Sequence, residues 1–253
     1  MQIHFKKNGS KYLYMALLMV VLGYAGVILY KTRPIDVYSM EKAGLFGDSF
    51  GVITCFFTAL GFIGLLINLK EQRANSKKQF FENNFFQMLN HLNEITKDID
   101  YVLKEPGPVI TSFYGKSAFS ELAGHLRNNY EVTSRELFFD PSKDEMQKVE
   151  FCYEKFWGLF GSKLGHYYRW LYNMLTYIDL YGGDNKDFYV KLVTAQLSNQ
   201  ELLLIYYNAC FSRGKNFQNY IVKYQMMGNL ESRELFLDEH ESFISGVNFW
   251  RPK

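Results

Sequence analysis

The sequence contains little cysteine and none of the short motifs that mark common enzyme classes. Its three cysteines, Cys55, Cys152 and Cys210, lie far apart in the chain. This spacing excludes a disulfide-rich scaffold and a metal site of the CxxC type. A P-loop, a GxGxxG turn, an HExxH helix and a nucleophile elbow are also absent, so no signature of a hydrolase or nucleotide-binding enzyme is present. We expect no metal and no cofactor.

A strong excess of charge of either sign is missing as well. The chain has 28 lysines and arginines against 26 aspartates and glutamates, which gives a net charge of +2. The two signs are mixed along the polar part of the chain. No global basic field therefore indicates a nucleic-acid partner, and we expect none on grounds of charge.

Charged residues are completely missing from two apolar runs, which cover residues 13–30 and 50–69. Each run has roughly 18–20 residues, enough for a helix to cross a bilayer core of about 30 Å. A signal peptide is one alternative for the first run, and a buried core helix is an alternative for both. The first run is too long for a typical signal peptide, and no cleavage site follows it. We predict a transmembrane helical hairpin over residues 13–69, with a loop at residues 31–49.

Lysine and arginine residues near the two runs predict the orientation of the hairpin. Seven of them flank its outer ends and three lie in the loop. Positive charge is enriched on the cytoplasmic side of membrane proteins. We therefore predict a protein of the bacterial inner membrane with both termini in the cytoplasm, residues 1–12 forming the N-terminal cytoplasmic segment. The outer residues are Lys6, Lys7, Lys11, Lys70, Arg73, Lys77 and Lys78, and the loop residues are Lys31, Arg33 and Lys42.

Small side chains recur along one face of the second apolar run. Gly51, Thr54, Thr58 and Gly61 follow one another at intervals of three and four residues. Small residues at this spacing allow helix backbones to approach closely within lipid. The partner is either the first run of the same chain or the second run of another copy, and the second alternative predicts a homo-oligomer.

A heptad-like apolar stripe follows the second run. Proline and glycine are absent from residues 68–104, and the segment Glu105-Pro106-Gly107-Pro108 comes next. We predict a juxtamembrane connecting helix over residues 70–104 that ends at this segment. The stripe either packs into the core of the same chain or forms a coiled seam between protomers. Its members are Phe81, Phe85, Met88, Leu92, Ile95, Ile99 and Val102.

Residues 105–253 show helical apolar spacing, and we predict that they form a cytoplasmic helical domain. The whole chain is then all-α: a two-span transmembrane hairpin followed by a cytoplasmic helical bundle. The sequence Ser198-x-x-Glu201 is a capping box for a helix that starts at Asn199. We predict loops at residues 106–114 and 131–140 and no β-strand. The predicted helices cover residues 117–130, a segment that opens at Asp140-Pro141 and breaks at 161–165, and residues 166–181, 199–211 and 217–227.

Four polar or aromatic residues within the predicted helix 166–181 are candidates for binding a ligand or partner. His166, Arg169, Trp170 and Asn173 share one helix face, apart from the apolar face. An arginine beside an aromatic ring and a titratable histidine is suited to a phosphate or a base. The alternative is a structural polar face whose groups are satisfied by a neighbouring helix.

Arg233 and His240, separated by six residues, are weak candidates for catalysis. Helical ribonucleases use an arginine to hold the scissile phosphate and a nearby histidine to assist proton transfer. Arginine and histidine pairs at this spacing are also common by chance, so the pattern identifies candidates and no more.

Six short blocks lie within residues 45–211: residues 47–51, 70–73, 85–89, 115–119, 166–172 and 197–202. In their order and spacing they resemble the AbiC-like family of putative phage abortive infection proteins of bacteria. The resemblance implies bacterial defence against phage, a two-span membrane protein and a helical cytoplasmic domain, and it supplies no catalytic residue. We expect an effector whose cytoplasmic domain senses a phage-derived trigger or companion protein and acts through oligomeric membrane spans. A membrane-tethered ribonuclease, a nucleotide-binding defence enzyme and a non-catalytic membrane anchor are the alternatives.

Overall fold

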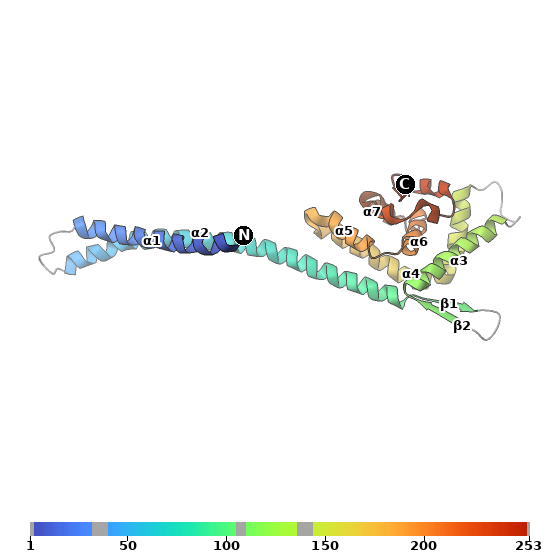
Figure 1. Ribbon diagram of the computed structural model, residues 1–253, viewed down its shortest axis with the longest axis horizontal. Helices are drawn as coiled ribbons and strands as arrows, with labels where there is room; N and C mark the ends of the chain where they lie inside the picture. The colour runs from blue at the N-terminus through green and yellow to red at the C-terminus, as the bar shows by residue number, and fades with distance from the viewer. Residues whose placement is uncertain (1–2, 32–39, 105–109, 136–143, 252–253) are drawn as a thin grey trace. The chain divides into compact units, whose positions relative to one another are not determined.

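α-Helices contain most of the residues that the computed structural model describes, which are 3–31, 40–104, 110–135 and 144–251 (Figure 1). The chain divides into two units, Met1–Asn75 and Ser76–Lys253. The long helix α2, Met40–Asp98, contributes residues to both. Each unit is described by itself below.

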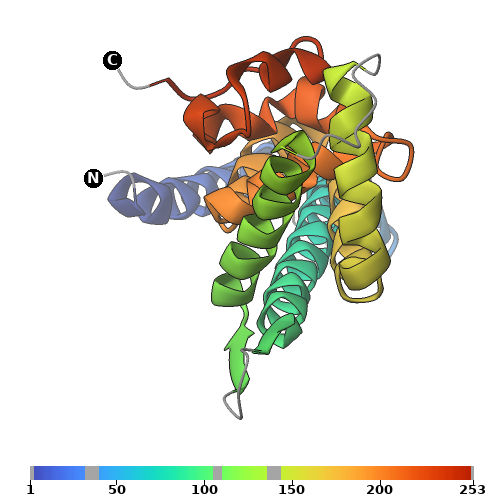
Figure 2. The same cartoon turned by 90° about the vertical axis from the view of Figure 1, so that its right-hand side faces the viewer.

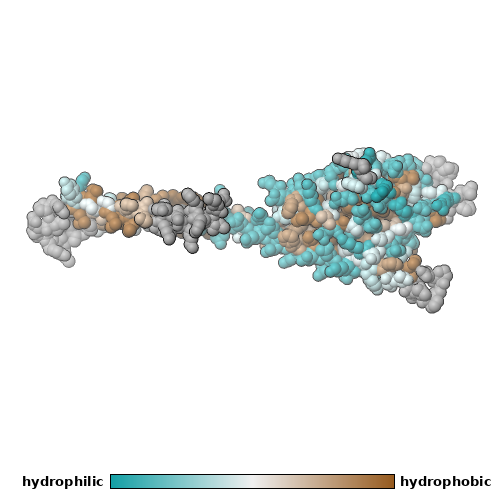
Figure 3. Space-filling model, in the orientation of Figure 1, coloured by the Kyte–Doolittle hydropathy of each residue, from teal (hydrophilic) through white to brown (hydrophobic). Residues whose placement is uncertain are grey.

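Unit 1 contains helix α1, Ile3–Lys31, and the first part of α2. The segment of α2 that begins at Phe50 has an 18-residue stretch with a mean hydropathy of 2.3, and none of that stretch is buried. Met15–Lys31 of α1 is a shorter apolar helix. Figure 3 shows hydrophobic side chains on the surface of this unit. The described residues therefore include one helix that is long and apolar enough to cross a membrane.

The loop predicted at residues 31–49 is shorter than expected. Helix α2 already begins at Met40, so residues 40–49 are helical, while residues 32–39 lie outside the described part of the chain. The aromatic rings of Tyr24 and Phe50 meet edge to face at 5.9 Å, which brings α1 and α2 into contact within unit 1.

Unit 2 is built from the end of α2, a β-hairpin and five further α-helices among the described residues. Helices α3 and α4 contact each other, and both contact α6 (Figure 2). Every residue of α6 from Glu201 to Cys210 is buried, so this helix lies at the centre of the unit. The elements after α2 are β1 Asp100–Lys104, β2 Ile110–Tyr114, α3 Lys116–Arg135, α4 Glu145–Tyr181, α5 Lys186–Thr194, α6 Asn199–Cys210 and α7 Phe217–Tyr224, with short 3₁₀ helices η1 Gly183–Asn185, η2 Met226–Asn229, η3 Ser232–Glu234 and η4 Asp238–Phe243.

The apolar stripe of α2 packs into the core of unit 2. Phe85 and Leu92 are almost completely buried, and Phe81 stacks on Tyr177 at 5.3 Å between ring centroids. The prediction of an intramolecular core is confirmed for the stripe from Phe81 to Ile99, and the alternative of a seam between protomers is wrong there, because these side chains are already covered by their own chain.

A two-stranded antiparallel sheet corrects the all-α prediction. Helix α2 ends at Asp98, and β1 pairs with β2 in a register that places Tyr101 opposite Phe113. The predicted helix is therefore wrong at residues 100–104 and the predicted loop is wrong at residues 110–114, whereas residues 105–109 lie outside the described part of the chain. The segments are rich in β-branched and aromatic residues, which favour strands when a partner strand is available. Gly115, at a φ of +60°, donates its N–H to Ile99 and closes the hairpin.

Helix α4 runs without a break through Gly161 and Gly165, where two separate helices were predicted. A glycine costs about 1 kcal/mol relative to alanine in a helix interior, and tertiary packing often outweighs that cost. Here a Cβ atom on Gly161 would lie 2.6 Å from the Trp157 ring, so the glycine makes room for the indole. The N-cap of α4 is Asp144, whereas the predicted start at Asp140-Pro141 lies outside the described residues.

The remaining helix predictions hold with shifted ends. The capping box at Ser198 and Glu201 is present at the start of α6. Helix α3 continues to Arg135, into a segment that was predicted as a loop. Helix α7 ends at Tyr224, and the 3₁₀ turns η2, η3 and η4 take the place of further α-helix.

Candidate functional site

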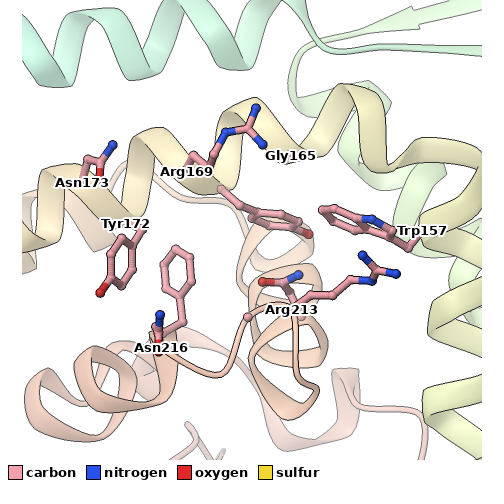
Figure 4. A pocket seen from close by; sticks show the side chains of 11 residues that line it. Trp157, Gly165, Arg169, Tyr172, Asn173, Arg213 and Asn216 are labelled. Atoms are coloured by element: carbon pink, nitrogen blue, oxygen red, sulfur yellow. The ribbon is translucent and has the colours of Figure 1, made fainter.

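A cavity of about 450 Å³ lies in unit 2 between α4 and the segment that joins α6 to α7 (Figure 4). Its lining combines aromatic rings, two arginines and three asparagines, and it contains no carboxylate. The lining residues, all within the described part of the chain, are Trp157, Gly165, Tyr168, Arg169, Tyr172, Asn173, Asn208, Arg213, Gly214, Asn216 and Phe217.

Aromatic rings form much of the cavity wall. The indole of Trp157 lies nearly parallel to the ring of Tyr168, at 6.1 Å and 14°. The Tyr168 hydroxyl is buried and has no hydrogen-bond partner among the described residues. Burial raises the pKa of this phenol well above its ordinary value, so the hydroxyl remains a neutral donor. An unpaired buried polar group costs about 1–3 kcal/mol. Because this hydroxyl is buried, Tyr168 contributes other atoms to the lining of the cavity.

Two guanidinium groups reach the cavity from different elements. Arg213 binds the Glu154 carboxylate through Nε at 2.9 Å and Nη2 at 2.8 Å, and its guanidinium lies 5.5 Å from the Trp157 ring. Arg169 is exposed and makes no hydrogen bond or ion pair with any described residue. Its side chain lies along α4 toward Gly165, as Figure 4 shows. A Cβ atom at Gly165 would be 3.3 Å from Arg169 Nη1, so the glycine leaves room for this position.

The three asparagines of the lining differ in whether their side-chain amides already form hydrogen bonds. Asn208 donates from Nδ2 to the Tyr153 hydroxyl at 2.6 Å. Asn173 and Asn216 are exposed, and their side-chain amides make no hydrogen bond to the described residues. Asn216 occupies the N-cap position of α7 without forming a side-chain cap. Two free amides, each with donors and an acceptor, therefore face the same cavity.

Gly214 fixes the connection between α6 and α7 over the end of α6. A Cβ atom at this position would lie 2.3 Å from the backbone oxygen of Asn208. Only glycine permits this approach, because the contact would be with backbone that cannot move aside. The close approach keeps Arg213 and Asn216, on either side of Gly214, at the cavity.

The four residues predicted to share a face of α4 lie in different environments in the structure. Arg169 and Asn173 line the cavity described above. His166 instead lines a second hollow of about 340 Å³ together with residues of α2 and β1. Trp170 donates its Nε1–H to the Met88 carbonyl at 3.1 Å and packs edge to face on His91. The structural alternative therefore describes Trp170, and the binding hypothesis is retained for Arg169 and Asn173.

The sequence pattern did not predict Trp157, Tyr168, Arg213 or Asn216 as site residues. The only sequence signal for Trp157 was its position four residues before Gly161, which suggests a large side chain covering a gap on the next turn. The approach of Arg213 and Asn216 to α4 depends on the path of the chain after α6, and no local pattern predicts it.

Arg233 and His240 occupy different environments. The Arg233 side chain is 73% exposed and pairs with Glu231. The His240 side chain is completely buried and bonds to Glu145 and Tyr207. No hydrogen bond joins Arg233 to His240 among the described residues. The structure therefore does not bring these two candidates together at a solvent-accessible site.

The hydrogen bonds around His240 define its protonation. The Glu145 carboxylate can only accept a hydrogen bond from the neutral imidazole, which assigns the ring proton to Nε2. Nδ1 therefore accepts from the Tyr207 hydroxyl at 2.9 Å, and this hydroxyl in turn accepts the Phe236 N–H at 2.9 Å. His240 Nε2 then carries the proton and faces Glu145 Oε1 at 3.4 Å. Burial lowers the pKa of His240, with the bond to Glu145 acting in the opposite direction, and the imidazole is neutral.

Glu145, Glu239 and His240 each offer a ligand atom, and these atoms lie within 4.8 Å of one another. The group is poorly suited to a metal ion, because Glu145 already accepts from Tyr130 at 2.5 Å and from Lys148 at 2.6 Å. Burial alone would raise the pKa of Glu145, but the bonds from Lys148 and Tyr130 outweigh it and leave the pKa below its ordinary value. The arrangement stabilises the fold around a buried histidine.

The stripe of small residues in unit 1 is exposed in the single chain. A Cβ atom at Gly51 or Gly61 would meet no described atom within 4 Å. The hydroxyls of Thr54 and Thr58 bond to carbonyls one turn earlier in the same helix, at 2.9 and 2.7 Å. The face is therefore open, and its hydroxyl groups are already satisfied.

A comparison with protein families gives one match. Residues 161–235 match the family described as "Putative phage abortive infection protein". The match confirms the resemblance found in the sequence over these residues, which include every lining residue of the cavity except Trp157. Neither the curated proteins nor the solved structures contain a match to this chain.

Proposed function

We propose, from the match of residues 161–235 to the phage abortive infection family, that this protein is an anti-phage effector of the bacterial inner membrane. In this proposal unit 2 responds to a phage-derived trigger or a companion protein, and the apolar helices of unit 1 act on the bilayer. The family match supports a role in abortive infection. We infer the mechanism from the surfaces of the two units, which are exposed apolar helices in unit 1 and a polar surface with a cavity in unit 2.

The observation that carries the membrane role is the exposed apolar part of α2. Its 18-residue stretch has no buried residue and a mean hydropathy of 2.3. A water-soluble protein would leave this surface in contact with water at a cost of about 25 cal/mol per Å² of apolar area. A bilayer removes that cost. The contact between Tyr24 and Phe50 supports a paired arrangement in which α1 enters the membrane beside α2.

The charges outside the apolar helices support a cytoplasmic location for both termini. Seven lysines and arginines flank the outer ends, against three between the two apolar runs. An alkaline phosphatase reporter fused after Lys253 should be inactive, and a green fluorescent protein reporter should be active. The reverse result would contradict this topology.

The open face formed by Gly51, Thr54, Thr58 and Gly61 supports association of several copies. The threonine hydroxyls are satisfied within their own helix, so the face can be buried against another helix without leaving a polar group unpaired. The apolar runs contain no charged residue, and one hairpin alone cannot surround water. Membrane permeation therefore requires an oligomer.

The test compares infected bacteria that carry the full chain with bacteria that carry the empty vector. We expect loss of membrane potential after infection, measured with a voltage-sensitive dye, before the phage burst and only in cells with the protein. Degraded RNA at unchanged potential would favour the ribonuclease alternative. Protection that requires a neighbouring gene, without depolarisation by this protein alone, would favour the anchor.

A further inference from the structure

We propose that the cavity between α4 and the α6–α7 connection binds a mononucleotide, with its phosphate at Arg169 and Arg213 and its base against the aromatic wall. The proposal concerns unit 2 alone and does not depend on the membrane role. A ligand bound there would give unit 2 a small-molecule input that the proposed function leaves unspecified.

The charge of the lining selects an anion. Arg169 has all of its donors free among the described residues, and Arg213 uses Nε and Nη2 on Glu154 while Nη1 stays available. Glu154, the acid that Arg213 binds, is not a lining residue. Guanidinium groups bind phosphate in a bidentate manner, which suits them to this anion better than a point charge.

The aromatic wall selects a planar group beside that anion. Trp157, Tyr168, Tyr172 and Phe217 all line the cavity, and Arg213 lies over the Trp157 face. Nucleobases stack on aromatic rings and on guanidinium planes. A free inorganic phosphate and a phospholipid headgroup both lack a planar ring, so neither would use this part of the lining.

The free amides match the edge of a base or a ribose. Asn173 and Asn216 present donors and acceptors that bond to no described residue, and asparagine pairs with the polar edges of bases. The volume of about 450 Å³ also suits a small ligand, since small-molecule pockets range over roughly 300–1,000 Å³. One cavity thus provides guanidinium groups for an anion, aromatic rings for a planar base and amides for the polar edge of that base.

The experiment uses the full chain in detergent micelles and measures binding by isothermal titration. The probes are AMP, GMP, CMP and UMP, with inorganic phosphate, adenosine and phosphatidylglycerol micelles as comparisons. We expect at least one mononucleotide to bind about tenfold more tightly than phosphate, adenosine or the lipid. No binding of any mononucleotide, or equal binding of inorganic phosphate, adenosine or lipid, would overturn the proposal.

Variants connect the binding to the cavity. Arg169→Gln and Arg213→Ala should each weaken mononucleotide binding about tenfold or more. Arg169 has no partner to lose, and the Arg213 pair with Glu154 is largely exposed, so both variants should fold. The matched control is Arg251→Ala, which removes another exposed arginine paired with a glutamate, Glu241. Equal loss in the control, or no loss in Arg169→Gln and Arg213→Ala, would place the binding elsewhere and overturn the assignment.

A fluorescence signal reports on the cavity directly. The chain has three tryptophans, and the double variant Trp170→Phe and Trp250→Phe leaves Trp157 alone. Saturating mononucleotide should quench or shift the Trp157 emission, because a phosphate bound by Arg213 would change the charge beside the indole. Unchanged emission at saturation would contradict binding against this ring. A negative result in these experiments leaves the depolarisation test of the proposed function unaffected, and the converse also holds.

Discussion

His240 and Glu145 meet inside unit 2 although 95 residues separate them in the chain, with Nε2 3.4 Å from Oε1. The contact joins the 3₁₀ turn η4 to the first turn of α4. Because Tyr207 occupies the other ring nitrogen, both nitrogens of this buried histidine are used in holding the C-terminal segment on the core. His240 is therefore a structural residue in this fold.

His240, which is buried, and His125, which is partly buried, predict a pH dependence of stability. Burial lowers the pKa of His240 and of His125, so below the unfolded pKa of about 6.5 the unfolded chain binds more protons than the folded one. The stabilisation is complete above that pH and is lost as the pH falls toward the lowered folded pKa. Thermal unfolding of the full chain should show a falling midpoint from pH 7.5 to 5.5.

In His240→Gln the midpoint of thermal unfolding should fall less between pH 7.5 and 5.5 than in the parent protein. The remaining fall should come from His125. The pKa values of Glu145 and Asp179 are lowered in the folded protein. Protonation of these two carboxylates therefore destabilises the fold only at a more acidic pH than this range. An identical slope in His240→Gln would show that His240 does not titrate in the way its environment indicates.

Arg169→Ala and His240→Ala should differ in their effect on protein abundance. His240→Ala removes a buried hydrogen-bonded side chain and should cost about 2–4 kcal/mol, so abundance and defence should fall together. Arg169→Ala removes an exposed side chain without a partner, so abundance should hold while defence falls. Immunoblots and plaque counts from the same cultures measure both. Normal abundance with lost defence in His240→Ala would instead revive the catalytic hypothesis.

Substitution by alanine should have opposite effects on stability at two glycines of α4 that lie three residues apart. A Cβ atom at Gly158 meets nothing within 4 Å, so Gly158→Ala should be neutral or stabilise by up to about 1 kcal/mol. A Cβ atom at Gly161 would lie 2.6 Å from the Trp157 ring. Gly161→Ala should displace the indole and destabilise by about 1–3 kcal/mol. Denaturant unfolding followed by tryptophan emission compares them, and equal effects would contradict the close packing of Trp157.

The small-residue face predicts a selective defect in defence. Gly61→Leu and Thr58→Leu add bulk where close helix approach is proposed, yet they raise hydrophobicity and should preserve insertion. Membrane fractionation should find both variants inserted, while plaque counts show reduced protection. Ala59→Leu, a small residue on another side of α2, is the control and should keep protection. Full protection in both test variants would indicate that the face contacts lipid.

Helix α2 offers a test of coupling between sensing and membrane action. Gln79 is exposed on α2 near the start of unit 2, and Gln79→Pro should interrupt the helix at a cost of about 3 kcal/mol. Defence should be lost while the protein remains in the membrane, and Gln79→Ala should behave like the parent. Retained protection in Gln79→Pro would favour a passive tether over a mechanical link.

The apolar stripe of α2 was predictable because its evidence lies within one helix. Phe81, Phe85 and Leu92 follow a period that the helix itself sets, and burial follows from that period. The β-hairpin was not predictable in the same way, since pairing of Tyr101 with Phe113 depends on two segments at once. The continuity of α4 depends on Trp157 filling the space beside Gly161, which outweighs the local propensity of glycine.

The candidate site shows the same division between local and long-range information. Arg169 and Asn173 lie four residues apart on α4, so their shared face was visible in the sequence. Arg213 and Asn216 reach the cavity only because Gly214 permits the chain to pass closely over Asn208. That approach is a property of the packed fold, and the amino-acid order alone does not reveal it.

The position of His240 late in the chain has a consequence for biosynthesis. Ribosomes add about 5–20 residues per second, and domains form in the order in which they are made. The apolar helices are synthesised before unit 2, and Tyr206 and Tyr207 at the centre of unit 2 receive their cover of His240 and Phe249 later still. If the apolar helices enter the bilayer as proposed, insertion can begin while unit 2 is still incomplete. Under the proposed function, a nascent chain would be anchored before unit 2 can respond to a trigger, and this order of events would limit premature activity in an uninfected cell.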